Sequence, residues 1–285
     1  MIGRIIRFWW KLLRSAVAGR SALAGCGVGL ATLFGGCAGG RPGASVSGGG
    51  TPPVLVQQLA WFDAARQRSV PVTLYLADTA AGRRAAPQRA AQKVAILNHG
   101  YGSSATAYSF LARLLVAHGY VVASVQHELP GDAPLPPASA HLYQDRLPSW
   151  ERGAANILFV RRQLRRTRPR LDYRHLLLLG HSHGGDMVAL LAGRQPRLAA
   201  AVITLDNRRV PLPRRRHPRM LTLRSSDQPA DPGVLPSAAE QRRFRMRVVP
   251  LPATLHNDMW DGASPAQQAE MSRVIAAFLG EPTGR

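Results

Sequence analysis

The chain has 285 residues, of which 46 % are hydrophobic, and this is enough apolar material for one sizeable core. The formal net charge is +21, and nearly all of it comes from arginine because Lys11 and Lys93 are the only lysines. The arginine clusters lack interleaved aromatic residues and match no nucleic-acid-binding motif, so we expect no nucleic-acid partner. The two cysteines, Cys26 and Cys37, lie near the N-terminus, which excludes a disulfide or a cysteine nucleophile in the rest of the chain.

The N-terminal segment has the order of a secretory signal. Residues 1–20 carry five basic residues and no acidic one, and residues 21–36 are apolar or small. This apolar run is shorter than the roughly 20 apolar residues that a membrane-spanning helix needs. We therefore expect export to the cell envelope or periplasm.

Cys37 follows Leu-Phe-Gly-Gly, a string that resembles the lipobox of bacterial lipoproteins, in which the cysteine is acylated. Cys26 follows Leu-Ala-Gly and matches the lipobox letters better, but Arg20 interrupts the apolar run before it. We expect a membrane anchor through an N-terminal lipid on Cys37, with Cys26 as the alternative site. A cleaved signal with an incidental cysteine remains the other interpretation.

These observations divide the chain into three parts: a signal segment over residues 1–37, a flexible tether over 38–53, and a catalytic domain over 54–285. In the domain, two strands form an antiparallel opening ribbon, and strands then alternate with helices. The expected strands are 54–61, 70–76, 94–97, 121–125, 176–179, 201–205, 220–223 and 247–250, and the expected helices are 104–117, 150–164, 184–192 and 265–279. Such alternation predicts an α/β fold, a mostly parallel sheet with helices on both faces.

Gly180-His-Ser-His-Gly184 directly follows a predicted strand and precedes a predicted helix. This context is typical of a nucleophile elbow, in which glycines permit a sharp turn that exposes the serine hydroxyl. The sequence therefore predicts Ser182 as a nucleophile. His256 follows the last predicted strand, so it is the expected general base.

The region from about Trp61 to Leu279 resembles the α/β hydrolases grouped with dienelactone hydrolases and platelet-activating-factor acetylhydrolase-like esterases. The resemblance rests on the opening ribbon, on His99-Gly-Tyr101 and on the Gly-His-Ser-His-Gly motif. It implies the α/β-hydrolase fold. It also implies that the backbone amides of Tyr101 and His183 form the oxyanion hole.

The acid of the triad is the least certain residue, because aspartates follow two neighbouring strands. Asp227 stands in a string similar to the usual hydrolase pattern of proline, apolar strand, turn and aspartate, so it is the preferred acid. Asp206 directly follows the preceding strand, which is where some acetylhydrolase-like members carry their acid. Asp231 is a third candidate. The acid holds the imidazole in the correct tautomer.

The segment 126–148 is rich in proline and is expected to cover the pocket. It contains His127, Glu128, Asp132, His141 and Asp145, but their spacing fits no recognised metal-ligand pattern, so neither metal nor cofactor is expected. The short interval between Asp206 and Pro218 leaves no room for a helical cap.

The motifs favour a serine esterase that cleaves a small-molecule carboxylic ester through an acyl-enzyme on Ser182. Two alternatives stay open. One is a noncatalytic envelope-binding protein on the same scaffold, because fold does not imply function. The other is a serine peptidase, which uses equivalent chemistry.

Overall fold

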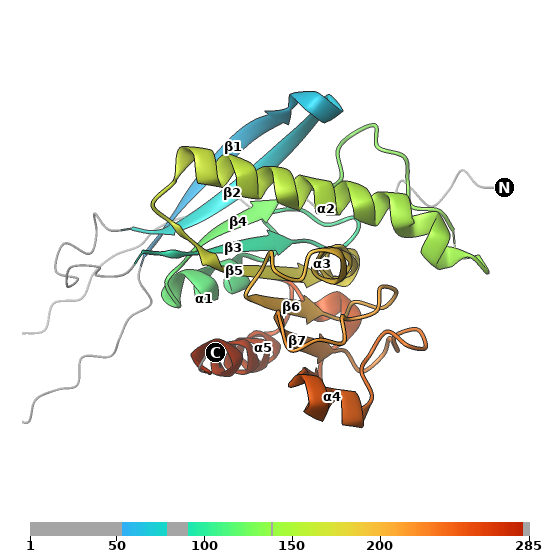
Figure 1. The fold of residues 1–285 in the computed structure, drawn as a ribbon. Coiled ribbons are helices and arrows are strands. Elements are labelled where there is room, and N and C mark those ends of the chain that lie inside the picture. Colours follow the sequence, from blue (N-terminus) through green and yellow to red (C-terminus); the bar gives the residue numbers. More distant parts are fainter. Residues whose placement is uncertain (1–52, 79–90, 138, 282–285) are drawn as a thin grey trace, which may run out of the picture. The chain divides into compact units, whose positions relative to one another are not determined.

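The computed structural model describes residues 53–78, 91–137 and 139–281, so the signal segment, Cys26, Cys37 and nearly all of the tether lie outside the described residues (Figure 1). The strands are β1 (Val54–Asp63), β2 (Arg68–Ala77), β3 (Lys93–Asn98), β4 (Tyr120–Val125), β5 (Asp172–His181), β6 (Ala201–Leu205), β7 (Arg219–Arg224) and β8 (Arg247–Pro250). The α-helices are α1 (Ser109–Ala117), α2 (Leu142–Thr167), α3 (Ser182–Arg194), α4 (Ala238–Phe244) and α5 (Pro265–Gly280). Two short 3₁₀ helices cover Ala64–Arg66 and His256–Asp258.

The strands form one sheet in the order β1-β2-β4-β3-β5-β6-β7-β8. β1 and β2 pair antiparallel, as do β2 and β4, and every other pairing is parallel. The parallel part places the carboxyl ends of β3, β5, β6, β7 and β8 along one edge, where ligands bind in open α/β sheets. The expected opening ribbon and parallel sheet are both confirmed.

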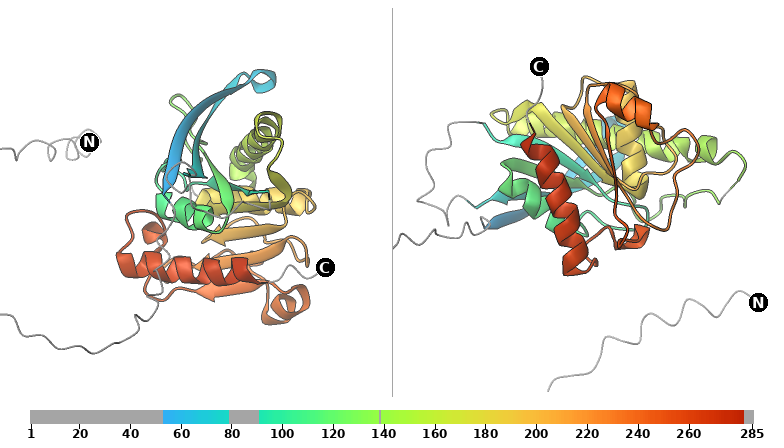
Figure 2. Two further views of the ribbon diagram at one scale, coloured as in Figure 1. Left: turned by 90° about the vertical axis from the view of Figure 1, so that its left-hand side faces the viewer. Right: turned by 90° about the horizontal axis from the view of Figure 1, so that it is seen from below.

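Alternate residues of the central strands enter two separate apolar clusters, one on each face of the sheet. In β5, Leu176 and Leu178 pack into the cluster that includes residues of α2 and α3, whereas Leu177 and Leu179 pack into the cluster of α1 and α5. The two layers of helices are visible from the end of the sheet (Figure 2). Because its strands are covered on both faces, the sheet needs the continuous apolar runs seen in the sequence.

Three helices differ from the sequence-based expectation. α1 begins at Ser109, five residues after its expected start. α2 begins at Leu142 and continues through Pro148, so the covering loop is shorter than expected and ends at His141. A proline removes one helical hydrogen bond, but here the fully buried Trp150 anchors the following turn and Tyr143 packs edge-on against its ring. α4 was not expected, although Ser237 and Glu240 form a capping box, a signal that is readable in the sequence.

In the described part of the chain, no helix combines the length and the apolar character that a membrane crossing requires.

Candidate active site

Ser182 stands at the sharp turn between β5 and α3. Its backbone has a φ of 50°, in the left-handed region that L-residues rarely adopt. The flanking glycines are required by close backbone approaches: a Cβ at Gly180 would lie 2.3 Å from the carbonyl oxygen of Gly184, and a Cβ at Gly184 would lie 2.4 Å from that of Asn98. The local geometry is therefore that of a strained nucleophile elbow.

His256 joins the serine to a buried carboxylate. Its Nε2 lies 2.9 Å from Ser182 Oγ, and its Nδ1 lies 2.5 Å from Asp206 Oδ2. Because the carboxylate accepts a hydrogen bond from Nδ1–H, the unprotonated Nε2 faces the serine hydroxyl and can accept its proton. Serine, histidine and aspartate thus have the relative positions of a hydrolytic triad.

Asp206 is fully buried at the end of β6. Burial alone raises the pKa of Asp206, but hydrogen bonds from His256 and Ser225 and the charge of Arg224 hold this pKa below its ordinary value. Arg224 Nη2 lies 2.7 Å from Asp206 Oδ1 without meeting hydrogen-bond geometry, so the contact is an ion pair. These partners keep the carboxylate charged beside the imidazole.

Asp227 does not contact the imidazole. The structure places Asp206 at the position expected for Asp227, which corrects the preference drawn from the sequence. Asp227 is exposed in the turn after β7 and accepts a hydrogen bond from the backbone amide of His256, with an N···Oδ1 distance of 2.7 Å. The third candidate, Asp231, pairs with Arg209. The physical reason is the direction of the two carboxylates: that of Asp206 reaches the imidazole from the end of β6, whereas that of Asp227 accepts the backbone amide of the same histidine.

Tyr101 and His183 both line a cavity together with Ser182. His183 is in the first turn of α3, where backbone amides have no intrahelical acceptor, and this suits an oxyanion donor. Tyr101 follows β3 in the loop that lines the cavity, and its ring lies edge-on to the His183 ring. The oxyanion-hole role of the two amides stays a prediction.

The ring of His183 is occupied elsewhere. Its Nδ1 accepts a hydrogen bond of 2.9 Å from the indole of Trp150, and its Nε2 lies 3.0 Å from Ser149 Oγ. Burial lowers the pKa of His183 to about 3, so the ring is neutral. Only the backbone of this residue therefore remains available to a substrate.

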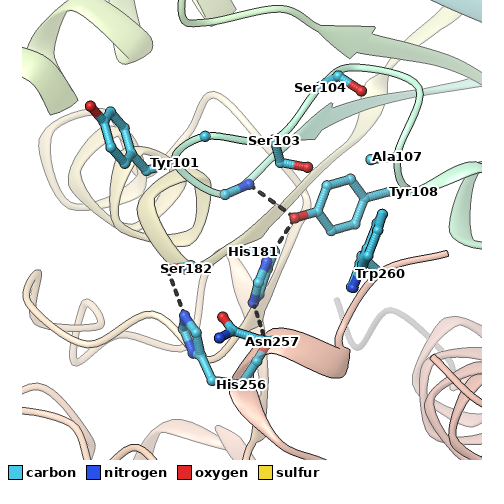
Figure 3. A pocket seen from close by; sticks show the side chains of 12 residues that line it. Tyr101, Ser103, Ser104, Ala107, Tyr108, His181, Ser182, His256, Asn257 and Trp260 are labelled. Carbon is cyan, nitrogen blue, oxygen red and sulfur yellow. Dashed lines mark hydrogen bonds between the residues drawn. The ribbon is translucent and has the colours of Figure 1, made fainter. Parts of the chain in front are cut away.

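A second histidine, His181, links the loops around the site, and the sequence reasoning gave it no role. Its Nε2 lies 3.1 Å from the carbonyl oxygen of His256 and must donate there, so its Nδ1 accepts from the Tyr108 hydroxyl at 2.7 Å. Tyr108 in turn accepts from the amide of Gly100 at 3.1 Å (Figure 3). Burial lowers the pKa of His181 to about 3, which keeps the ring neutral. These hydrogen bonds connect the loop after β3 to the loop that carries His256.

The acidic and histidine residues of the covering loop do not converge. His127 Nε2 contacts Asn98 Oδ1 at 2.9 Å, whereas Asp132 forms an ion pair with Arg68 at 2.7 Å. Within residues 53–78, 91–137 and 139–281, no three histidine, cysteine or acidic side chains come together as a metal site would require.

Ser182 and His256 open into a cavity of about 530 Å³. Its lining, shown in Figure 3, consists of Gly100, Tyr101, Gly102, Ser103, Ser104, Ala107, Tyr108, His181, Ser182, His256, Asn257 and Trp260. The cavity has room for a small organic ligand whose reactive group reaches the serine hydroxyl.

Comparisons with known proteins agree with this geometry. Residues 89–212, less than half of the chain, match the family described as serine aminopeptidase, S33. The matched stretch includes Ser182 and Asp206 but ends before His256. A search of curated proteins gave no significant match.

Solved structures resemble the chain over most of its length. A ferulic acid esterase from Streptomyces cinnamoneus is 20 % identical, with a TM-score of 0.56 over 82 % of this chain and 91 % of its own. A dienelactone hydrolase-like promiscuous phosphotriesterase from metagenomic libraries is 13 % identical, with a TM-score of 0.54 over 79 % and 97 % of the two chains. A bacterial heroin esterase is 14 % identical, with a TM-score of 0.54 over 79 % and 83 %. With the elbow and the strand order above, these matches confirm that the chain has the α/β-hydrolase fold that the sequence resemblance implied.

Proposed function

We propose that the chain is a serine esterase that hydrolyses carboxylic esters of small molecules through an acyl-enzyme on Ser182. One observation carries the proposal: His256 lies 2.9 Å from Ser182 Oγ and 2.5 Å from Asp206 at the wall of an open cavity. A scaffold that only binds has no physical need for these three groups in this order. The esterases among the structural neighbours add support for the same class of reaction.

The proposed reaction has two halves. Ser182 attacks the ester carbonyl while His256 takes its proton, and the tetrahedral oxyanion is held by the amides of Tyr101 and His183. His256 then gives the proton to the leaving alcohol. In the second half, His256 activates a water molecule that releases the acid from the serine. Asp206 stabilises the imidazolium formed in both halves and needs no cofactor to do so.

A serine aminopeptidase is the second candidate, because the matched family carries that description. Such an enzyme must hold the positively charged α-amino group of a peptide beside its nucleophile. Here Arg146, Arg208 and Arg209 line a cavity that reaches Ser182, and their charges repel an ammonium group. This charge pattern favours the esterase.

The proposal for the N-terminus rests on the sequence alone. Cys37 and Cys26 lie outside the described residues, so lipidation, export and attachment to the cell envelope stay predictions.

The proposed function is tested with purified protein and p-nitrophenyl esters of increasing acyl length, beside a peptide and a lactone. The wild type is expected to release p-nitrophenolate, and Ser182→Ala is expected to abolish turnover while its circular dichroism spectrum stays unchanged. A folded Ser182→Ala variant that keeps substantial turnover would show that the nucleophile is wrong. A wild type without turnover on any substrate would favour the noncatalytic alternative.

A further inference from the structure

A second cavity of about 290 Å³ meets the first one at the nucleophile. Ser182 and Tyr101 line both cavities, whereas His256 and Trp260 line only the first. The walls of the second cavity carry three arginines, which are Arg146, Arg208 and Arg209. Arg146 comes from the first turns of α2, and the other two follow β6, so separate elements converge on the same space.

Two of these guanidinium groups form no direct ion pair with a described residue, although the carboxylate of Asp186 is near enough to act on the charge of both. Arg209 pairs with Asp231, but neither Arg146 nor Arg208 forms an ion pair or a side-chain hydrogen bond with any residue that the structure describes. The Nε atoms of Arg146 and Arg209 are buried and lack a hydrogen-bond partner among the same residues. Buried polar groups without partners are costly and mark places where a ligand supplies the missing interaction.

The electrostatics of the cavity are positive. Burial lowers the pKa of Arg146 and of Arg208, and the nearby charge of Arg209 lowers both further. Asp186 is the acidic residue in the wall, and burial raises its pKa to about 6. One of its oxygens already accepts the backbone amides of Arg209 and Val210. The three arginines face the two carboxylates of Asp186 and Asp231, which leaves one positive charge in excess. Asp206 also acts on Arg208, but this carboxylate is already paired with Arg224. The cavity therefore suits a ligand with a single negative charge.

The position of His256 on one side of Ser182 determines which part of a bound ester reaches the second cavity. His256 must protonate the leaving alkoxide, so the alcohol portion leaves through the first cavity, which His256 lines. The acyl portion then extends to the other side of Ser182, where His183 and the three arginines lie.

We propose that the arginine-lined cavity binds a carboxylate at the far end of the acyl group, so that the preferred substrates are monoesters of dicarboxylic acids. This inference rests on the proposed function, because it names the substrate class of the same site. Arginine pairs with carboxylates through two parallel hydrogen bonds, and no residue that the structure describes takes such a contact from the side chain of Arg146 or Arg208.

The test compares two activated esters of equal chain length. Mono-p-nitrophenyl glutarate carries the carboxylate, and its methyl ester, p-nitrophenyl methyl glutarate, does not. For the wild type we expect kcat/KM to be higher for the charged ester by about ten-fold or more, the size of one charge-assisted hydrogen bond. Arg146→Gln and Arg208→Gln are each expected to lower this ratio several-fold. Arg113→Gln, an exposed arginine on α1, is the matched control and should leave the ratio unchanged.

A second measurement does not depend on the variants. Free glutarate should inhibit hydrolysis of the neutral ester by the wild type competitively, and its neutral diamide should not. Equal rates on both esters together with no inhibition by glutarate would overturn the inference. A ratio that survives in folded Arg146→Gln and Arg208→Gln proteins would overturn it as well.

The placement of the charge on the acyl side has its own control. 4-Acetoxybenzoate carries its carboxylate on the leaving group, and the wild type should not prefer it to methyl 4-acetoxybenzoate. A preference for 4-acetoxybenzoate over its methyl ester would contradict the placement of the bound carboxylate on the acyl side of the substrate. If the neutral esters are cleaved through Ser182 and no charge preference is found, only this inference fails. If no ester is cleaved, the proposed function fails, and this inference fails with it.

Discussion

The loops after β6 and β7 each bring an aspartate to the same histidine, but the two carboxylates reach different atoms. Asp206 contacts the imidazole and is fully buried, whereas Asp227 accepts the backbone amide of His256 and is exposed. One aspartate is therefore placed to act on the charge and tautomer of the His256 ring, and the other on the position of its loop. Contact with a reacting residue does not by itself identify the acid of a triad.

His256 is also held at its backbone carbonyl oxygen. His181 donates to its carbonyl oxygen and is itself oriented by Tyr108. Ring, amide and carbonyl are thus bound by three different elements of the fold. Substitutions at each of the three contacts distinguish residues that affect turnover through the His256 ring from residues that only hold its backbone in place.

Asp206→Asn is expected to have the largest effect. An asparagine keeps the shape, but it no longer stabilises the imidazolium and it allows the wrong tautomer of His256. Turnover of p-nitrophenyl esters should fall on the order of 10⁴-fold, the loss associated with this change in other triads. Steady-state kinetics above the titration range of histidine measure it, and circular dichroism checks the fold. A loss of ten-fold or less would mean that Asp206 is not the acid.

Asp227→Ala is expected to reduce kcat by roughly ten-fold or less. It removes one hydrogen bond to the backbone of the histidine loop, and such a bond contributes about 1 kcal/mol. Asp227→Asn keeps an acceptor oxygen and should restore most of the activity. The roles assigned to the two aspartates would be wrong if kcat fell by several orders of magnitude in Asp227→Asn while Asp206→Asn stayed active.

Tyr108→Phe is expected to have the smallest effect on turnover, a loss of only a few-fold. The change leaves the Gly100 amide and His181 Nδ1 without their partner, and this should lower the free energy of unfolding by about 1–3 kcal/mol. Urea denaturation measures the stability, and kcat and KM are measured on the same preparation. An unchanged stability would show that this chain of hydrogen bonds contributes nothing to holding the loops together.

The sequence predicted most of the fold because the signals are local. Apolar runs bounded by glycine and proline marked the strands, and the glycines around Ser182 marked a turn whose close contacts exclude any side chain. α4 was missed although its capping box is visible, and the helix expected from residue 150 begins at Leu142, with Pro148 inside it.

The site was less predictable because its contacts join distant strands. Asp206 and Asp227 both follow a strand, and only the contacts of the folded loops show which carboxylate reaches the imidazole. The contact of His181 with Tyr108 spans 73 residues, and no local pattern indicates it. The sequence also did not predict that Arg146 and Arg208 line one cavity. These residues are far apart in the chain, and α2, which carries Arg146, begins eight residues earlier than the sequence indicated.

The central claim is that His256 and Asp206 activate Ser182 as a nucleophile, and covalent labelling tests it most directly. The wild-type protein is treated with a fluorophosphonate, which reacts with activated serines, and the digested protein is analysed by mass spectrometry. We predict one phosphonate adduct, on the peptide that contains Ser182, with labelling strongly slowed in Asp206→Asn and nearly normal in Asp227→Asn. A wild-type protein without an adduct on Ser182, or with its adduct on a different serine, would contradict the account.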